Sequence, residues 1–565
     1  MTNQIGGRNT DMALSSKDGL PLVRGRQQRV MDVLLALTLV LVAVCGAVEI
    51  ARGSEPYFNN DEPRHIMTAV FWCDFLRVKP MTDPIGFAYA YYGHYPAVAP
   101  LYWPPLAHMV TGLLFLVTGP SVAVARLFVL FVTLLVLVIQ GKLVKGWLGS
   151  DVIVIAVLLL AASPAFEGFR SIFMLEMPCM LWMLLSVLFL GSFIRSNRSS
   201  YIWLCSGSVI AALLTKQHAL GIVPAVVLGA LVGFRKCHWH NWHTYAAAAL
   251  AILIPGGYYA VAFSVTSSIW KHVVIPSGGS VATDLMGFFW GMGPLSVLLG
   301  VGGALVFLGR GRADWLRWAS IVWIAGVFAV YLLPATRDAR YLVYCAPALA
   351  ILAANFFAFV NRRLPATLRW VAISAIVAVC WYQVVQSSNE RMNGFEGAAI
   401  KANDLASNGI IVFGGYFDGP FILYRRLHDD ALKTITFRAD KLLGEGNILP
   451  HRGYTGFVGS PEGVRQVFEA TGAEIAVIED QPGIDAKEHR WFWDFVHGRG
   501  FQFVDSVRVT YHNARSGQVS FYRYLGPKGT WGKTTIPMLT LREGSLSFDP
   551  ERSLLEWGRK QGTRR

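Results

Sequence analysis

Charged side chains are scarce in this sequence of 565 residues: Asp, Glu, Lys and Arg make up only 15% of it. Hydrophobic residues reach 54%, and the mean hydropathy is +0.43. Soluble domains contain about 25% charged residues. The composition therefore excludes a soluble globular protein. It predicts a polytopic α-helical membrane protein with room for one further domain.

Cysteine is sparse as well. The seven cysteines are scattered, and none follows Cys380, so the sequence contains neither a disulfide framework nor a Cys-x-x-Cys metal motif. Internal repeats and low-complexity tracts are also lacking. The net charge of +14 does not require a nucleic-acid partner, because the basic cytoplasmic loops of a membrane protein supply such an excess.

Long apolar segments recur through the first two-thirds of the chain. A helix needs about 20 residues to cross a bilayer. We place eleven spans, near 31–51, 123–141, 152–172, 177–194, 201–215, 219–234, 243–263, 285–308, 316–334, 341–360 and 367–386. The polar residues 1–29 are predicted to form a cytoplasmic tail, and no convincing small-residue cleavage site is visible, so we expect an uncleaved first span.

Basic residues occupy every second loop between these spans. Lys142 and Lys145, Arg195 and Arg198, and Arg362 and Arg363 are examples. Such loops face the cytoplasm in membrane proteins. With eleven spans, the N-terminus is then cytoplasmic and the chain after the last span lies outside. We expect a bacterial plasma (inner) membrane protein.

The spans divide the chain into regions. Residues 30–388 are predicted to be the transmembrane domain, with an outer loop and interfacial helices at 52–122. In 389–525, strand-like and helix-like runs alternate, which predicts a small extracytoplasmic α/β domain. The polar residues 526–565 are expected to form an irregular tail. Within the outer loop, a helix is expected over Glu62–Arg77, and Leu106–Val117 is too short to span.

Ionisable side chains gather where the predicted spans reach the outer surface. The stretch Asn59–His65 contains Asp61, Glu62, Arg64 and His65 within seven residues. Charges at a membrane edge are costly, so they indicate function unless another explanation suffices. The alternative for Asp61 is a helix cap, with Pro63 in the first helical turn.

Further charges lie at the same side. Glu176 opens the fourth span, where an acid also suits the helix dipole. Lys216 lies where the fifth span ends, and snorkelling to the interface would also explain it. Arg337 and Arg340 are three residues apart and could either grip a phosphate or pair with Asp338.

Several segments together resemble a known family, the integral-membrane glycosyltransferases of the C superfamily. The similarity is to protein O-mannosyltransferases and bacterial aminoarabinose transferases, and it runs through about 55–365. It rests on Asp61-Glu62, Tyr102-Trp103-Pro104-Pro105-Leu106, Gly119-Pro120-Ser121 to Ala125-Arg126-Leu127, Leu175-Glu176-Met177-Pro178, Thr215-Lys216 and Arg340-Tyr341-Leu342. Two positions depart from the family: Glu176 stands where Asp is commoner, and Gln217-His218 replaces the frequent Gly-Pro.

The resemblance implies a membrane glycosyltransferase whose catalytic part is 30–388. Such enzymes move a sugar from a polyprenyl-phosphate carrier to a lipid, glycan or protein acceptor on the outer face, usually with inversion. The family's first-loop acid corresponds to Asp61, with Glu62 beside it, and its second acid to Glu176.

The chemistry needs a base for the acceptor hydroxyl and positive charge near the departing phosphate. Asp61 is the candidate base, with Glu62 and Glu176 as further catalytic candidates. The candidates for binding the donor phosphate are Arg337, Arg340, Lys216 and Lys79. The candidates for lining a sugar or acceptor pocket are Arg64, His65, Tyr102 and Tyr341. A divalent metal, held by Asp61, Glu176 and His65, is left open.

A secondary transporter or a flippase for lipid-linked sugars is the alternative function. Transporters often contain internal repeats and spans broken near the bilayer midplane. Here no repeat is visible, and the acids gather at outer span ends instead of mid-span. The sequence therefore favours a transferase over a transporter, and both over a non-catalytic scaffold.

Overall fold

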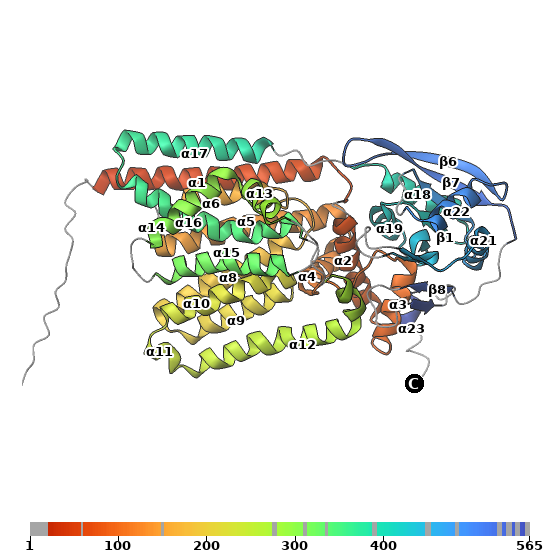
Figure 1. The fold of residues 1–565 in the computed structure, drawn as a ribbon, viewed down its shortest axis with the longest axis horizontal. Coiled ribbons are helices and arrows are strands. Elements are labelled where there is room, and N and C mark those ends of the chain that lie inside the picture. Colours follow the sequence, from red (N-terminus) through yellow and green to blue (C-terminus); the bar gives the residue numbers. More distant parts are fainter. Residues whose placement is uncertain are drawn as a thin grey trace, which may run out of the picture.

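The computed structural model describes residues 21–57, 60–148, 152–273, 280–308, 314–333, 337–386, 392–446, 454–480, 485–527, 534–537, 545–548 and 554–559. A long bundle of helices lies at one end of the molecule and a smaller domain built around a sheet lies at the other (Figure 1). Helices α2 and α3 lie between the two parts. Residues 1–20, most of the expected cytoplasmic tail, are outside the described residues.

The bundle consists mainly of long apolar helices. They are α1 (Pro21–Ala51), α5 (Val122–Leu148), α8 (Glu176–Ser196), α12 (Trp242–Val273), α15 (Trp315–Leu332), α16 (Ala346–Asn361) and α17 (Ala366–Gln386). A short 3-10 helix, η4 (Ala339–Cys345), leads directly into α16. Among the described residues, seven helices are long and apolar enough to cross a membrane, or up to eight if one bent pair is a single span. The protein is an integral membrane protein, and the predicted count of eleven spans is not confirmed.

The predicted span 152–172 is broken. Helix α6 (Ile153–Ala161) has only nine residues, or about 14 Å of length, less than half the thickness of a bilayer core. It ends just before Pro164, which starts the four-residue helix α7 (Pro164–Glu167). Proline favours the first position of a helix because it has no N–H to donate. The whole of α6 is buried among neighbouring helices.

The predicted span 285–308 is two helices instead of one. Helices α13 (Val281–Met292) and α14 (Pro294–Leu308) meet at an angle of 102°. Gly293 lies between them with a positive φ of 84°, which favours glycine. The expected spans 201–215 and 219–234 are the shorter helices α9 (Ser199–Leu213) and α10 (Val223–Gly233), with a 3-10 turn, η3 (Gln217–Ile222), between them.

Three peripheral helices occupy the predicted outer loop. They are α2 (Asp61–Val78), α3 (Pro84–His94) and α4 (Leu106–Thr118). The sequence predicted α2 and α4 to within a few residues, from Glu62–Arg77 and Leu106–Val117. Most of α2 is buried, because it packs against α4 on one side and against the sheet domain on the other.

The smaller domain has a mixed five-stranded sheet in the order β2-β1-β5-β7-β6. Its strands are β1 (Ile410–Gly414), β2 (Ile435–Arg438), β5 (Ile475–Glu479), β6 (Phe501–Thr510) and β7 (Ser516–Tyr524). Its helices are α18 (Phe395–Leu405), α19 (Asp418–Leu427), α20 (Ala439–Leu442), α21 (Pro461–Ala470) and α22 (Lys487–Val496), and a small ladder joins β3 (Gly444–Gly446) to β4 (Tyr454–Gly456). Strands β2, β1 and β5 are parallel, so their carboxyl ends lie at one edge of the sheet.

The expected irregular tail, 526–565, contains regular structure. Strands β8 (Thr534–Pro537) and β9 (Ser545–Phe548) form an antiparallel pair beside α3 and α20, followed by α23 (Glu556–Arg559). The ring of Trp557 lies 6.3 Å from that of Phe87 in α3. This apolar anchor explains why a mostly polar segment is held against α3.

Candidate active site

The first turn of α2 begins the site. Asn60 occupies the cap position with a left-handed backbone, φ 63°, and its side chain makes no capping bond. Asp61 is the first helical residue, so it does not cap the helix. Its carboxylate contacts the bundle instead: Oδ2 lies 2.8 Å from Nη1 of Arg340. The side chain of Asp61 keeps 20% of its surface exposed, so a substrate can reach it.

Arg340, at the start of η4, binds several partners. Besides Asp61, its Nε lies 2.9 Å from Oδ2 of Asp338, and its Nη2 donates to the hydroxyl of Tyr341 at 2.9 Å. Arg340 thus pairs with Asp338, as the sequence allowed, and at the same time with Asp61. A guanidinium with several donors in one plane can also accept a phosphate in place of a carboxylate.

A second ion pair, Glu176–Lys216, lies behind the first. Oε1 of Glu176, the first residue of α8, lies 2.6 Å from Nζ of Lys216, which directly precedes η3. Both side chains are almost completely buried, so Lys216 does not snorkel to the surface. Its Nζ lies 4.9 Å from the ring centre of Tyr341, and Arg340 lies beside the same ring. Tyr341 therefore connects the two ion pairs.

Two buried polar atoms near these pairs lack hydrogen-bond partners among the described residues. They are Oε2 of Glu176 and Nδ1 of His218. The imidazole of His218 stacks on Tyr341, with ring centres 4.0 Å apart. Buried polar atoms without partners are costly, and a bound hydroxyl would satisfy them. Sequence reasoning noted His218 only as a departure from the family pattern and did not place it in the site.

Tyr102 lies in the segment before α4, close to Asp61 and Tyr341. Burial raises the pKa of Tyr102, and the nearby Tyr341 and Asp61 raise it further. The phenol therefore stays protonated at neutral pH and remains a hydrogen-bond donor. The structure thus brings together Asp61, Glu176, Lys216, Arg340, Tyr341 and Tyr102 of the predicted site residues.

Glu62 lies apart from this cluster. Its two carboxylate oxygens accept bonds of 2.8 and 2.9 Å from Arg126 in α5, and Oε1 also accepts the N–H of Phe173 at 3.0 Å. The side chain has no exposed surface. The geometry therefore places Glu62 in a buried structural pair and not beside Asp61 as a second catalytic acid. Sequence reasoning missed Arg126 as its partner.

His65 is also engaged elsewhere. Its Nδ1 lies 3.0 Å from Nε2 of His108, and its ring packs on Trp103. Burial lowers the pKa of His65 well below its usual value, and His108 lowers it further. In the part of the chain that the structure describes, no three His, Cys, Asp or Glu side chains are placed to hold a metal ion. Asp61, Glu176 and His65, the ligand set that the sequence left open, are among the side chains not grouped in this way.

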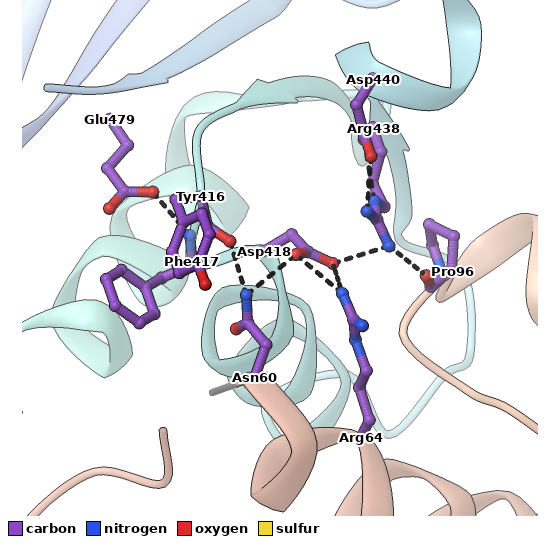
Figure 2. Close-up of polar contacts among 9 residues, drawn as sticks. All are labelled: Asn60, Arg64, Pro96, Tyr416, Phe417, Asp418, Arg438, Asp440 and Glu479. Atoms are coloured by element: carbon purple, nitrogen blue, oxygen red, sulfur yellow. Dashed lines mark hydrogen bonds and ion pairs between the residues drawn. The ribbon is translucent and has the colours of Figure 1, made fainter. Parts of the chain in front are cut away.

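Three predicted cations lie outside the cluster. Arg64 binds Asp418 of the sheet domain, with Nη2 at 3.2 and 3.3 Å from its two oxygens (Figure 2). Arg337 pairs with Asp284 of α13 at 3.0 Å. Lys79 ends α2 in a left-handed conformation, about 27 Å along the helix from Asp61, since an α-helix rises about 1.5 Å per residue. The structure therefore does not place Lys79 near the site.

Comparison with known proteins gives the fold. The family model described as dolichyl-phosphate-mannose-protein mannosyltransferase matches residues 103–259. The structure of ArnT from Cupriavidus metallidurans in the apo state is 15% identical, with a TM-score of 0.59 over 90% of this chain and 100% of that chain. The protein has the glycosyltransferase C fold. The structure of the same ArnT bound to undecaprenyl phosphate is also 15% identical, with a TM-score of 0.54 over 86% of this chain and 97% of that one.

No curated protein sequence gives a significant match. The segment matched by the mannosyltransferase family model contains Glu176 and Lys216 but neither Asp61 nor Arg340. Within this glycosyltransferase C fold, the candidate site combines side chains from α2, from α8, from η4 and from the residue just before η3. The predicted fold class, a polytopic helical membrane protein of this type with a small C-terminal sheet domain, is confirmed.

Proposed function

We propose that the protein is an inverting glycosyltransferase that moves a hexose or pentose from a polyprenyl-phosphate carrier to a lipid, glycan or protein acceptor at the outer face of the membrane. The observation that supports this most is that two ion pairs, Asp61–Arg340 and Glu176–Lys216, both lie beside the ring of Tyr341. It combines a reachable carboxylate with two cations, the groups that transfer from a sugar phosphodiester requires.

Asp61 is the proposed base. It takes the proton of the acceptor hydroxyl while that oxygen forms a bond to the anomeric carbon of the sugar. The bond between this carbon and the phosphate oxygen breaks, and its electrons leave with the polyprenyl phosphate. One negative charge is thereby transferred from Asp61, which becomes neutral, to the phosphate. Attack from the side opposite the leaving group inverts the anomeric configuration.

Arg340 and Lys216 are the proposed binding groups for the departing phosphate, whose charge grows during the reaction. In the structure each cation is paired with a carboxylate, Asp61 or Glu176. A donor phosphate would compete with Asp61 for the guanidinium of Arg340. Donor binding would then release the Asp61 carboxylate to accept a proton, so that the base becomes available when the donor is present.

Glu176 and His218 are proposed to bind the sugar. Each has a buried polar atom without a hydrogen-bond partner among the described residues, and both lie beside Tyr341 or Lys216. Sugar hydroxyls can donate to the free oxygen of Glu176 and either donate to or accept from His218. Tyr102 and Tyr341 complete the polar side of this pocket.

The nature of the donor is supported by the comparisons. The matching family description names a dolichyl-phosphate-linked sugar, and a similar structure binds undecaprenyl phosphate. Both are polyprenyl phosphates whose chain stays in the bilayer. The alternating basic loops support a cytoplasmic N-terminus and a sheet domain on the opposite side of the membrane. The membrane that we propose is a bacterial plasma membrane.

The test uses purified protein, a panel of labelled polyprenyl-phosphate sugars and an extract of envelope lipids and glycans as acceptors. We expect one donor to be consumed, with release of polyprenyl phosphate and an acceptor-linked sugar of opposite anomeric configuration by NMR. Movement of intact donor across proteoliposome membranes without cleavage would instead favour the flippase alternative.

A further inference from the structure

Tyr416 and Asp418, which follow strand β1, meet the first turn of α2 (Figure 2). Nδ2 of Asn60 donates to the carbonyl of Tyr416 at 2.6 Å and lies 3.4 Å from Oδ1 of Asp418. Asn60 has only 5% of its surface exposed and precedes Asp61 directly. A left-handed backbone is uncommon for a residue other than glycine. The sheet domain therefore holds Asn60, the left-handed residue after which α2 begins at Asp61.

Asp418 is the centre of this contact. It is the first residue of α19, and its carboxylate binds both Arg64 of α2 and Arg438 at the end of β2, the latter at 2.9 Å. Arg438 is in turn held by Asp440 at 2.6 Å and reaches the carbonyl of Pro96 at 3.3 Å. The side chain of Asp418 is 6% exposed. Asp418 thus has fixed partners in both parts of the molecule.

Gly419, the next residue, permits the two helix starts to approach each other. A Cβ atom at this position would lie 2.9 Å from Oδ1 of Asn60 and 2.9 Å from Cγ of Pro63. Real Cβ atoms essentially never make such contacts, so with any other residue at 419 the side chain of Asn60 and the ring of Pro63 have to move. The turn that contains Asp61 is therefore in van der Waals contact with α19.

Two further contacts hold the surroundings of this turn. Glu55, before α2, accepts the N–H groups of Gly394, Phe395 and Glu396 at the start of α18, at 3.0, 2.8 and 3.0 Å. Further along α2, Asp74 binds Arg426 of α19 with two bonds of 2.5 and 2.8 Å. The sheet domain thus holds the chain both before and after Asp61, at Glu55 and at Asp74.

From these contacts we propose that the C-terminal domain is part of the catalytic apparatus, and that Asp418 is a positioning residue that orients Asp61 toward Arg340 through Asn60 and Arg64. This inference rests on the proposed transferase function. A shift of about 1 Å in a catalytic group can cost about 100-fold in rate. The sheet domain can therefore influence the rate by holding Asp61 in position, although it does not itself contact the substrate.

The test compares three variants of the full-length protein: Asp418→Asn, Gly419→Ala and, as a matched control, Gly397→Ala. Gly397 lies in α18 of the same domain, and a Cβ there meets only Val507 at an ordinary 3.8 Å. We measure thermal unfolding, amide hydrogen exchange of the peptide containing residues 60–65, and kcat and KM for the donor. We expect faster exchange in this peptide and a fall in kcat of at least 10-fold in the first two variants, with donor KM little changed. The control should match the wild-type protein.

The exchange experiment does not depend on activity. Unchanged exchange at 60–65 in both Asp418→Asn and Gly419→Ala would overturn the proposal. A loss of kcat that is fully explained by the fraction of unfolded protein would also overturn it, because Asp418 would then only stabilise the fold. If the wild-type protein consumes no donor, the proposed function fails, whereas faster exchange would still show that the domain fixes the turn of Asp61. Asp418→Glu, which keeps the charge, should restore part of the lost kcat.

Discussion

Glu62 and Arg126 form a two-bond ion pair that is almost closed to solvent, although Asp61, the residue before Glu62, is within reach of a substrate. Consecutive residues of an α-helix point about 100° apart, since 3.6 residues complete a turn. One acid of the Asp-Glu pair therefore faces the bundle interior and the other faces the candidate site. Two adjacent carboxylates thus have different partners and different exposure to solvent.

We expect Glu62→Gln to destabilise the protein and to leave its turnover per folded molecule largely intact. The substitution leaves Arg126 buried without a counter-charge, and breaking a buried ion pair costs about 3–5 kcal/mol. Thermal unfolding and turnover, normalised to the folded fraction, measure the two effects. A variant that unfolds normally but no longer turns over donor would return Glu62 to the catalytic residues.

Asp61→Asn should have the opposite profile. Asn cannot take the acceptor's proton, so turnover should fall about 100- to 10,000-fold. Stability should change little, because the side chain is partly exposed and Arg340 keeps its contact with Asp338. Turnover of the donor panel by the folded variant measures this, with Glu176→Gln beside it. Near-native turnover would move the base to another carboxylate.

Arg340→Lys and Arg337→Lys should differ in donor affinity. Lysine keeps the charge but lacks the planar set of donors that binds a phosphate with two bonds. Because Arg340 lies beside Asp61 whereas Arg337 pairs with Asp284, we expect about 10-fold weaker binding of a polyprenyl phosphate only for Arg340→Lys. Equal losses in both variants would favour the expectation from sequence that the two arginines bind phosphate together.

A pH effect is expected from Glu479 in the sheet domain. Burial raises the pKa of Glu479 to about 8, although its carboxylate accepts the N–H of Phe417. In the unfolded chain the pKa of this carboxyl is 4.5. Between pH 4.5 and pH 8 the folded protein therefore holds a proton that the unfolded chain has lost. The stability that this proton contributes is therefore fully present below about pH 4.5 and is lost as the pH rises toward 8, by on the order of 3 kcal/mol at pH 7.

Glu479→Gln should remove this dependence, because the amide keeps an acceptor oxygen for Phe417 and does not ionise. Thermal unfolding at pH 5 and pH 8, followed by tryptophan fluorescence, compares the variant with the wild-type protein. We expect the variant to be the more stable of the two at pH 8. An identical pH dependence in both proteins would show that Glu479 is not responsible.

The orientation of the chain gives a further prediction. If the basic loops face the cytoplasm, a reporter active only in the cytoplasm and fused after Gln386 should be silent, and one fused after Arg363 should be active. The second fusion shows that silence is not caused by poor expression. Activity after Gln386 would place the sheet domain inside the cell.

Local sequence patterns predicted the elements that local forces determine. The apolar face of 62–77 and the apolar run 106–117 predicted α2 and α4, and the strand-like apolar run Ile475–Ile478 predicted β5. Hydropathy also predicted the long spans, because each is a single uninterrupted apolar run. It failed at Pro164 and Gly293, where apolar sequence continues but the backbone changes direction. Hydropathy gives the length of an apolar segment but no information on the direction of its backbone.

The candidate site was predicted in part. Asp61, Glu176, Lys216 and Arg340 do come together, since each lies at the same end of a membrane helix or next to one. Arg64 does not join them, because Asp418 lies far away in the sequence and only the tertiary fold brings it close. The partners of Glu62 and His65 were missed for the same reason.

The bond between Asp74 and Arg426 has a consequence for protein engineering. Asp74 belongs by sequence to the membrane part, yet it is 1% exposed and is neutralised by a residue of the sheet domain. A chimaera that exchanged only the sheet domain for that of a relative lacking Arg426 would leave this carboxylate buried without a counter-charge. The segment that can be exchanged as a unit has to include α2, so the transferable module is larger than the boundary after α17 indicates.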